Sequence, residues 1–273
     1  MPQSKKKRLP LLEMFGVLLA LIWLSPFYLM IVNAFKTNRE IFQDVLGLPS
    51  EATVDNFVQA YIDLNFLQAL FNSTLITAIS ILVIIFFSSM AGYALARNKS
   101  VISGILLLIF VAAMLIPFQA VMITLTSLFG SFHALNTGGL IFMYLGFGCS
   151  LAIFLYHGAM KSIPITMDEA AKIDGANRLQ TFWYIIFPLL KPISVTVAIL
   201  NVIWIWNDFL LPSLVLSTSE ATIPLRMFSF FGEYTRQWHL ALAGLTIAII
   251  PVIIFYFFAQ KQIIKGVSEG AVK

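Results

Sequence analysis

Long stretches without charged residues constrain this chain more than any other feature of its sequence. From Ser100 to Met160 it contains no Asp, Glu, Lys or Arg, and only 11% of its 273 residues are charged. Soluble domains carry about 25% charged residues. A membrane-crossing helix needs about 20 mostly apolar residues, because its backbone must satisfy its own hydrogen bonds in hydrocarbon. The sequence therefore excludes a soluble enzyme, a disordered regulator and a nucleic-acid-binding protein, and it predicts an all-α integral membrane protein.

The charge-poor windows predict six transmembrane helices. The window from 100 to 160 is too long for one helix, and turn-rich residues 129–139 divide it into two spans. The other windows are Met14–Phe35, Leu64–Ala96, Pro192–Ser219 and Gln237–Gln260. The first window follows a basic cluster, as in a secretory signal. However, it is longer than the usual apolar core of about 7–15 residues and lacks a small-residue cleavage site, so we interpret it as a retained span.

The basic residues indicate the orientation of these spans in the lipid bilayer. Six spans return the chain to the side from which it started. Of the 17 Lys and Arg residues, all fall on the side of the termini except Lys36, Arg39, Arg226 and Arg236. Because basic residues are enriched in cytoplasmic loops, we expect both termini to be cytoplasmic.

The cytoplasmic loop of residues 161–191 has a helical pattern of its own. Thr166 and Glu169 have the spacing of a capping box, in which each side chain binds the backbone N–H of the other residue. Gly175 then predicts a stop or a sharp turn, and residues 178–184 predict a second short helix. An amphipathic helix lying on lipid headgroups is the alternative interpretation of this loop.

The same loop resembles the EAA loop of ABC-importer permease subunits. Glu169-Ala170-Ala171, then Gly175 and Ile185-Ile186-Phe187-Pro188 carry the likeness, although Phe187 replaces the family's leucine. Further segments are similar to carbohydrate-uptake permeases of the maltose and multiple-sugar (raffinose-like) type, so that the likeness covers nearly the whole chain: Asn72-Ser73, residues 91–97, residues 206–209 and residues 270–273.

This resemblance implies a fold, a function and a set of partners. The fold is the type I importer permease, with a core at residues 66–261, preceded by residues 1–65 and followed by a cytoplasmic tail at 262–273. The function is sugar import, with oligosaccharides as the expected class, across the plasma or inner membrane of a bacterium. The expected partners are a second permease, two cytoplasmic ATPase subunits, and an extracellular or periplasmic sugar-binding protein.

The resemblance also assigns roles in coupling to the ATPase. Glu169 would be a charged anchor to the ATPase, Ala170 and Ala171 would allow close approach, and Gly175 with the neighbouring Asp174 would form the turn. ATP and Mg²⁺ would bind the ATPase subunits, since no glycine here is followed by lysine and a Walker A loop is absent. We expect no cofactor and no catalysis in this chain.

Polar residues in the fifth span are candidates for the substrate pathway. Asn201, Trp204 and Asp208 are spaced at i, i+3 and i+7, and Asn207 lies beside Asp208. This spacing predicts one helical stripe of polar and aromatic groups, which suits the hydroxyl edge and C–H face of a sugar. The alternative is that Asn201 and Asp208 bind neighbouring helices.

An aromatic-rich outer loop, residues 218–238, is the candidate contact for the binding protein. We single out Phe231 and Tyr234, because aromatic and arginine side chains often anchor protein interfaces. An ordinary aromatic belt at the membrane surface is the alternative.

Two other classes of membrane protein compete with the permease interpretation. A self-contained secondary transporter or channel would favour inverted repeats and several buried ionisable residues, and the sequence offers only Asp208. A membrane enzyme would need clustered Asp, His, Glu or Cys residues, whereas the three histidines are scattered and Cys149 is the single cysteine. The spacing of these residues predicts no metal site.

Overall fold

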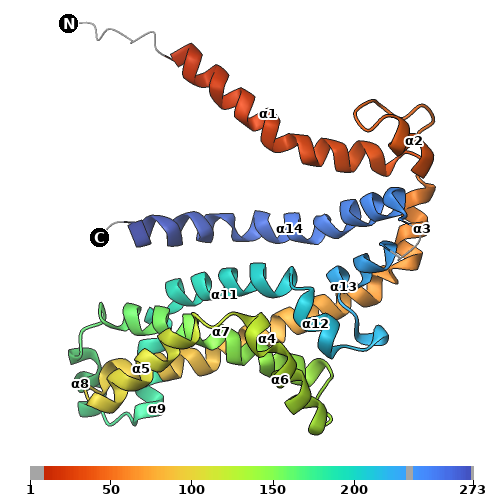
Figure 1. Ribbon diagram of the computed structural model, residues 1–273. Coiled ribbons are helices and arrows are strands. Elements are labelled where there is room, and N and C mark those ends of the chain that lie inside the picture. The colour runs from red at the N-terminus through yellow and green to blue at the C-terminus, as the bar shows by residue number, and fades with distance from the viewer. Residues whose placement is uncertain (1–8, 232–235, 272–273) are drawn as a thin grey trace, which may run out of the picture. The chain divides into compact units, whose positions relative to one another are not determined.

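The backbone is helical along almost its whole described length, as expected for a chain that must satisfy its hydrogen bonds in a membrane. The computed structural model describes residues 9–231 and 236–271 (Figure 1). It divides into two compact units: residues 1–66 with 227–252, and residues 67–226 with 253–273.

Unit 1 contains α1 (Leu9–Ala34), α2 (Asn38–Gln43), α3 (Asp55–Asp63), the 3₁₀ helix η3 (Phe228–Phe230) and the first part of α14 (Trp238–Ala271). Buried polar side chains hold the loop between α1 and α3. Lys36 is fully buried, and its Nζ donates to the carbonyl oxygen of Asp44 at 2.7 Å. Asn56 Nδ2 donates to the carbonyl oxygens of Ala34 and Lys36, each at 2.8 Å.

Unit 2 contains the last part of α14, from residue 253, and the elements that follow one another from the end of α3 to the start of η3. They are α4 (Phe66–Arg97), α5 (Val101–Ala113), α6 (Phe118–Ser131), α7 (Thr137–Met160), α8 (Thr166–Ile173), α9 (Arg178–Gln180), the π-helix η1 (Thr181–Ile186), α10 (Phe187–Leu189), α11 (Lys191–Trp206), α12 (Leu210–Val215), the 3₁₀ helix η2 (Thr218–Glu220) and α13 (Ile223–Met227).

Four helices in the described residues are long and apolar enough to cross a membrane singly: Glu13–Ala34, Phe66–Arg97, Thr137–Met160 and Trp238–Phe257. Two bent pairs qualify together. α5 and α6 meet at 101°, and residues 178–189 meet α11 at 75°. Six spans result if each bent pair counts as one, in agreement with the predicted number. The bounds of the fifth differ, because the second pair covers Arg178–Trp206 and the predicted span was Pro192–Ser219.

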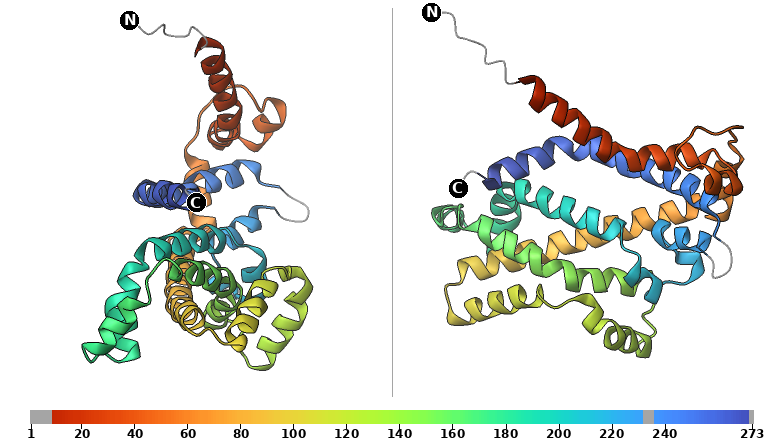
Figure 2. Two further views of the ribbon diagram at one scale, coloured as in Figure 1. Left: turned by 90° about the vertical axis from the view of Figure 1, so that its left-hand side faces the viewer. Right: turned by 45° about the horizontal axis from the view of Figure 1, so that its top comes forward.

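The structure differs from six straight helices at the bends of these two pairs. Pro117 is the N-cap of α6, with ψ of 140°, and proline has no amide hydrogen with which to continue the hydrogen bonds of α5. The right-hand view of Figure 2 shows the bend between α5 and α6. The expected span Pro192–Ser219 is also interrupted, because α11 ends at Trp206 and α12 begins at Leu210.

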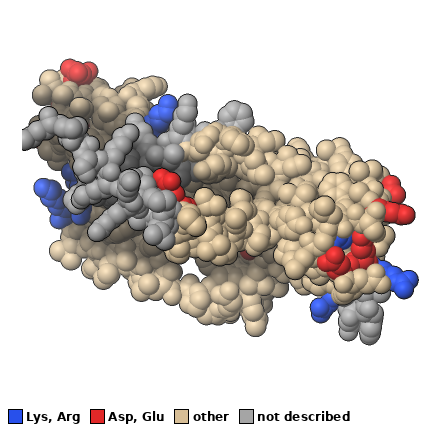
Figure 3. All heavy atoms as spheres, turned by 90° about the horizontal axis from the view of Figure 1, so that it is seen from above, with Lys and Arg blue, Asp and Glu red and all other residues tan. Residues whose placement is uncertain are grey.

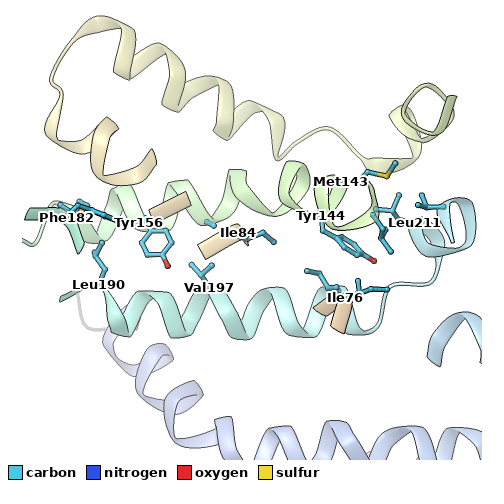
Figure 4. Packing of buried hydrophobic residues seen from close by; sticks show 14 of the residues in the cluster. Ile76, Ile84, Met143, Tyr144, Tyr156, Phe182, Leu190, Val197 and Leu211 are labelled. Carbon is cyan, nitrogen blue, oxygen red and sulfur yellow. The ribbon is translucent and has the colours of Figure 1, made fainter. Parts of the chain in front are cut away.

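The core of unit 2 lies around α7. Tyr144, Tyr156, Phe182, Leu190 and Val197 are each at most 2% exposed, and Figure 4 shows these side chains between α7 and α11 and at the end of α7. α4 also approaches α7 closely: a Cβ at Gly92 would lie 2.6 Å from the Cβ of Tyr156. A residue larger than glycine would therefore force α4 and α7 apart.

The outer surfaces of the long helices are apolar. α1 leaves large side chains such as Trp23 and Phe15 exposed, at 76% and 60%. Figure 3 shows uncharged atoms over the middle of the visible face and most charged side chains toward its two ends. Apolar surface of this extent requires lipid or a protein partner to cover it.

Candidate functional site

The inner segment, residues 161–191, begins with a helix that lacks the predicted cap. α8 starts at Thr166, its N-cap is Ile165, and no side chain caps it. The predicted capping box of Thr166 and Glu169 is therefore wrong. Ile165 already has helical dihedrals (φ −64°, ψ −24°), so Thr166 lies inside the first turn, and the amide of Glu169 donates to the carbonyl oxygen of Ile165 at 3.2 Å.

A capping box does form at the start of α9, the helix that follows α8. The Asn177 side chain accepts from the amide of Gln180 at 2.9 Å, and Gln180 Oε1 accepts from the amide of Asn177 at 2.8 Å. The pair Asn-x-x-Gln carries this signal in the sequence but was not among the predicted caps.

Between the two helices, Gly175 makes the predicted sharp turn. Its φ is +85°, a value that L side chains rarely adopt. The amide of Gly175 donates to the carbonyl oxygen of Lys172 at 3.1 Å, and the amide of Ala176 donates to that of Ala171 at 2.9 Å. These two bonds are the hydrogen bonds of a Schellman motif, which ends α8 and redirects the chain.

The turn presents an exposed surface of mixed character. Glu169, Ala170 and Asp174 are exposed on it, and Ile173 and Tyr184 are 85% and 79% exposed. A hollow of about 300 Å³ lies beside Gly175, and it is lined by Asp174, Gly175, Ala176, Gln180, Tyr184 and Ile185. Figure 2 shows this segment at one end of the helices of unit 2.

Ala171 does not share this surface. Its side chain is only 2% exposed and packs within the chain. Of the two alanines that the resemblance assigns to close approach, Ala170 is exposed and Ala171 is not.

A polar cluster that was not predicted from the sequence connects α8 to the end of α4. Arg97 Nη2 lies 2.8 Å from Asp168 Oδ2, and Tyr93 Oη donates to Asp168 Oδ1 at 2.7 Å. Arg97 Nη1 also donates to the carbonyl oxygen of Ile163 at 3.1 Å. The only sequence signal was the spacing of Tyr93 and Arg97 by one helical turn near the end of a span.

The candidate substrate residues do not form one stripe. α11 ends at Trp206, so Asp208 lies beyond the helix. Asp208 Oδ2 accepts from Tyr144 Oη at 2.9 Å, and its Oδ1 accepts from the amide of Leu210 at 3.1 Å, at the start of α12. Trp204, on the neighbouring turn, packs edge-on against Tyr144 with ring centroids 5.4 Å apart.

The two asparagines of this set face different surroundings. Asn201 is buried, its Nδ2 donates to the carbonyl oxygen of Val197 at 2.8 Å, and its side chain lies against Gly148 of α7. Asn207 is exposed and donates to the carbonyl oxygen of Ile203 at 2.7 Å. The structure therefore brings Trp204 and Asp208 together at Tyr144 and leaves Asn207 outside this cluster.

The described part of the predicted binding-protein loop contains a small aromatic cluster around Phe231. Phe231 packs edge-on against Trp238 at 5.4 Å, contacts Phe228 at 6.4 Å, and pairs through the backbone with Arg236. Tyr234 lies outside the described residues.

A second outer feature joins residues 217–222 to the start of α7. The amide and Oγ1 of Thr137 donate to Glu220 Oε1 at 3.1 and 2.7 Å. These hydrogen bonds from Thr137 lower the pKa of Glu220, which keeps its carboxylate charged at the positive N-terminus of α7. Among the described residues, no three His, Cys, Asp or Glu side chains gather to hold a metal ion.

Comparison with known proteins identifies relatives along nearly the whole chain. The chain is 53% identical over 264 residues to the probable starch degradation products transport system permease protein AmyC of Thermoanaerobacterium thermosulfurigenes, covering 96% of both chains. It is 37% identical over 268 residues to the multiple sugar-binding transport system permease protein MsmG of Streptococcus mutans, covering 96% of this chain and 95% of the relative.

Solved structures confirm the predicted fold. A bacterial ABC transporter involved in the import of the acidic polysaccharide alginate matches with a TM-score of 0.75 at 22% identity, over 96% of this chain and 99% of the other. The MetNI methionine ABC transporter matches with a TM-score of 0.55 at 15% identity, over 73% and 95%. This is the type I importer permease fold. Residues 84–269 also match the binding-protein-dependent transport system inner membrane component. The chain belongs to this family of multi-pass permease subunits.

Proposed function

We propose that this chain is the membrane permease of an ATP-driven sugar importer and that it takes up oligosaccharides. Its relatives in Thermoanaerobacterium thermosulfurigenes and Streptococcus mutans are named for starch degradation products and multiple sugars. The observation that carries the coupling part of the proposal is the Schellman turn at Gly175, with a hollow of about 300 Å³ and exposed apolar side chains beside it.

In this proposal, two cytoplasmic ATPase subunits bind ATP and Mg²⁺, and one of them receives the inner segment of this chain. Glu169 is the charged anchor, Ala170 allows close approach, and Asp174 and Gly175 hold the turn. A second permease completes the membrane pathway. The chain itself hydrolyses nothing, and its role is to move in response to the ATPase.

On the outer side, the proposal places a sugar-binding protein against Phe231 and Tyr234. Phe231 contacts Phe228, whose side chain is 57% exposed, and pairs through the backbone with the exposed Arg236. Trp204, beside the Tyr144–Asp208 pair, is 40% exposed and is the group of this set best placed to meet a sugar face.

Purification of the tagged chain and uptake assays test this function. We expect the chain to co-purify in mild detergent with an ATPase and a second permease, and a strain lacking the gene to lose uptake of at least one oligosaccharide while monosaccharide uptake continues. Vesicles that contain this chain alone and accumulate sugar without ATP would contradict the proposal and favour a secondary transporter.

Cysteine labelling in intact cells tests the orientation. With Cys149→Ser as background, we expect an impermeant thiol reagent to modify Ser50→Cys, in the loop between α1 and α3, and to spare Ser162→Cys until the cells are opened. Both side chains are exposed, whereas Asn56 in the first loop is buried and makes a poor labelling position. Labelling of Ser162→Cys and not Ser50→Cys in intact cells would reverse the orientation.

A further inference from the structure

We propose that α4 is a rigid link that passes movement of the inner segment to the outer turn, residues 217–222. The inference rests on the proposed function, in which the inner segment carries the ATPase. It assigns Tyr93, Arg97 and Asp168 as positioning residues at the inner end of the link, and Asn72 and Ser73 at its outer end.

At the inner end, α4 holds α8 by three polar contacts. Both carboxylate oxygens of Asp168 are used, one by Arg97 at 2.8 Å and one by Tyr93 at 2.7 Å. Arg97 also binds the carbonyl oxygen of Ile163, just before α8. The Arg97 and Asp168 side chains are each 17% exposed, so water weakens this ion pair less than it weakens an exposed one.

Non-helical residues on both sides make these contacts important for α8. Residues 161–165 precede it, and the turn at Gly175 follows it. A short helix between two such connections can shift relative to the rest of the chain. Because Tyr93 also packs its ring on Phe182, at 5.2 Å, the cluster joins α4, α8 and η1 in one contact.

At the outer end, α4 holds the outer turn in a comparable way. Asn72 Nδ2 lies 3.1 Å from the carbonyl oxygen of Ser219 and 3.2 Å from that of Ala221. The amide of Ile223 donates to Ser73 Oγ at 2.9 Å. Asn72 and Ser73 are 8% and 2% exposed.

The body of α4 is suited to carry movement between these ends. It has 32 residues without an internal proline, which corresponds to a length of about 48 Å. The bent pairs α5–α6 and α10–α11 break instead at residues 114–117 and near Leu190. An unbroken hydrogen-bonded helix moves as one body, so a shift at Asp168 reaches Ser219.

Thiol labelling of the outer turn in the assembled importer tests the link. In a Cys149→Ser background, Ser219→Cys adds a thiol at an exposed position. We expect its labelling rate to change at least threefold when the complex, reconstituted in vesicles, binds a non-hydrolysable ATP analogue. Asp168→Asn keeps an acceptor for Tyr93 but removes the charge that pairs with Arg97. We expect it to abolish the nucleotide-dependent change and to lower the sugar moved per ATP hydrolysed about tenfold.

Controls separate a broken link from a misfolded chain. Lys99→Ala removes a charge from an exposed position two residues beyond Arg97 and should leave the labelling change intact. If Asp168→Asn does not assemble, Tyr93→Phe, which keeps the ring contact with Phe182, should reduce the labelling change at least twofold. An unchanged response in either assembled variant overturns the link.

The remaining outcomes distinguish this inference from the proposed function. Failure of any ATPase to co-purify with the parent chain overturns the proposed function. The ATPase can bind and hydrolyse ATP while the labelling rate of Ser219→Cys in the parent complex stays the same with and without the ATP analogue. In that case the link is wrong and the proposed function stands.

Discussion

Replacing Gly175 with valine should remove most ATP-dependent sugar uptake. Gly175 has φ of +85°, and a β-branched residue in this region costs roughly 1–2 kcal/mol, enough to lower the population of the turn about tenfold. Nothing lies within 4 Å of a Cβ placed at this position, so the effect comes from the backbone and not from a clash. Uptake of labelled oligosaccharide and co-purification of the ATPase measure it.

Gly175→Asn is the matched control for this prediction. Asparagine also adds a side chain, but it tolerates positive φ. We therefore expect the Gly175→Asn chain to keep most of its sugar uptake and to co-purify with the ATPase. If valine and asparagine behave like glycine, the turn has no part in coupling. If both are equally damaging, the side-chain volume at the partner surface matters and the backbone conformation does not.

Asp208→Ala should destabilise the chain and strongly reduce transport. Tyr144 is fully buried, and its hydroxyl donates to Asp208 at 2.9 Å. Without the carboxylate, this hydroxyl and the amide of Leu210 lose their acceptor, at a cost of about 1–3 kcal/mol for a buried polar group. Thermal unfolding of the purified complex and sugar uptake measure the two effects.

Asp208→Asn distinguishes a structural anchor from a sugar ligand. The asparagine oxygen can accept from the amide of Leu210, while its NH₂ group donates to the Tyr144 hydroxyl oxygen, so that only the hydroxyl hydrogen loses its acceptor. We therefore expect Asp208→Asn to recover most of the stability and uptake that Asp208→Ala loses. A stable Asp208→Asn complex with uptake as low as that of Asp208→Ala would instead make Asp208 part of the substrate pathway.

The sequence predicted the number of membrane spans, because hydropathy and length determine it directly, but it misplaced the bounds of the fifth span. It did not predict where the spans bend. A proline such as Pro117 can either lie within a continuous membrane helix or end it. The outcome depends on which groups bind the freed backbone atoms, and those groups are distant in sequence. The comparisons confirm the type I permease fold, and the family match confirms the predicted class of permease subunit.

In the inner segment, the sequence predicted the turn but not the caps. Glycine at a helix end has a strong local signal, whereas the choice between Thr166 and Ile165 as N-cap depended on the dihedral angles of Ile165. The contact of Tyr93 and Arg97 with Asp168 joins residues separated by about 70 positions. No periodicity in a single sequence indicates such a pair, so only the fold reveals it.

The fifth span shows why spacing alone misplaced the polar stripe. The i, i+3, i+7 pattern presumes a continuous helix, but Asn207 and Asp208 fall after the end of α11. Asp208 bonds to a neighbouring helix, as the alternative interpretation expected, because its partner Tyr144 belongs to α7.

The break between α5 and α6 has a consequence for where lipid can reach this protein. The α-helical hydrogen-bond pattern is interrupted at residues 114–117 within an otherwise apolar span, and the side chains of Leu115 and Ile116 are 83% and 54% exposed on this chain. Hydrocarbon offers no hydrogen-bond partner for the peptide groups that such a break releases, so irregular backbone at this depth survives only against protein or water. Acyl chains should therefore be excluded from this side of the subunit, which leaves it for another polypeptide or for a hydrated passage.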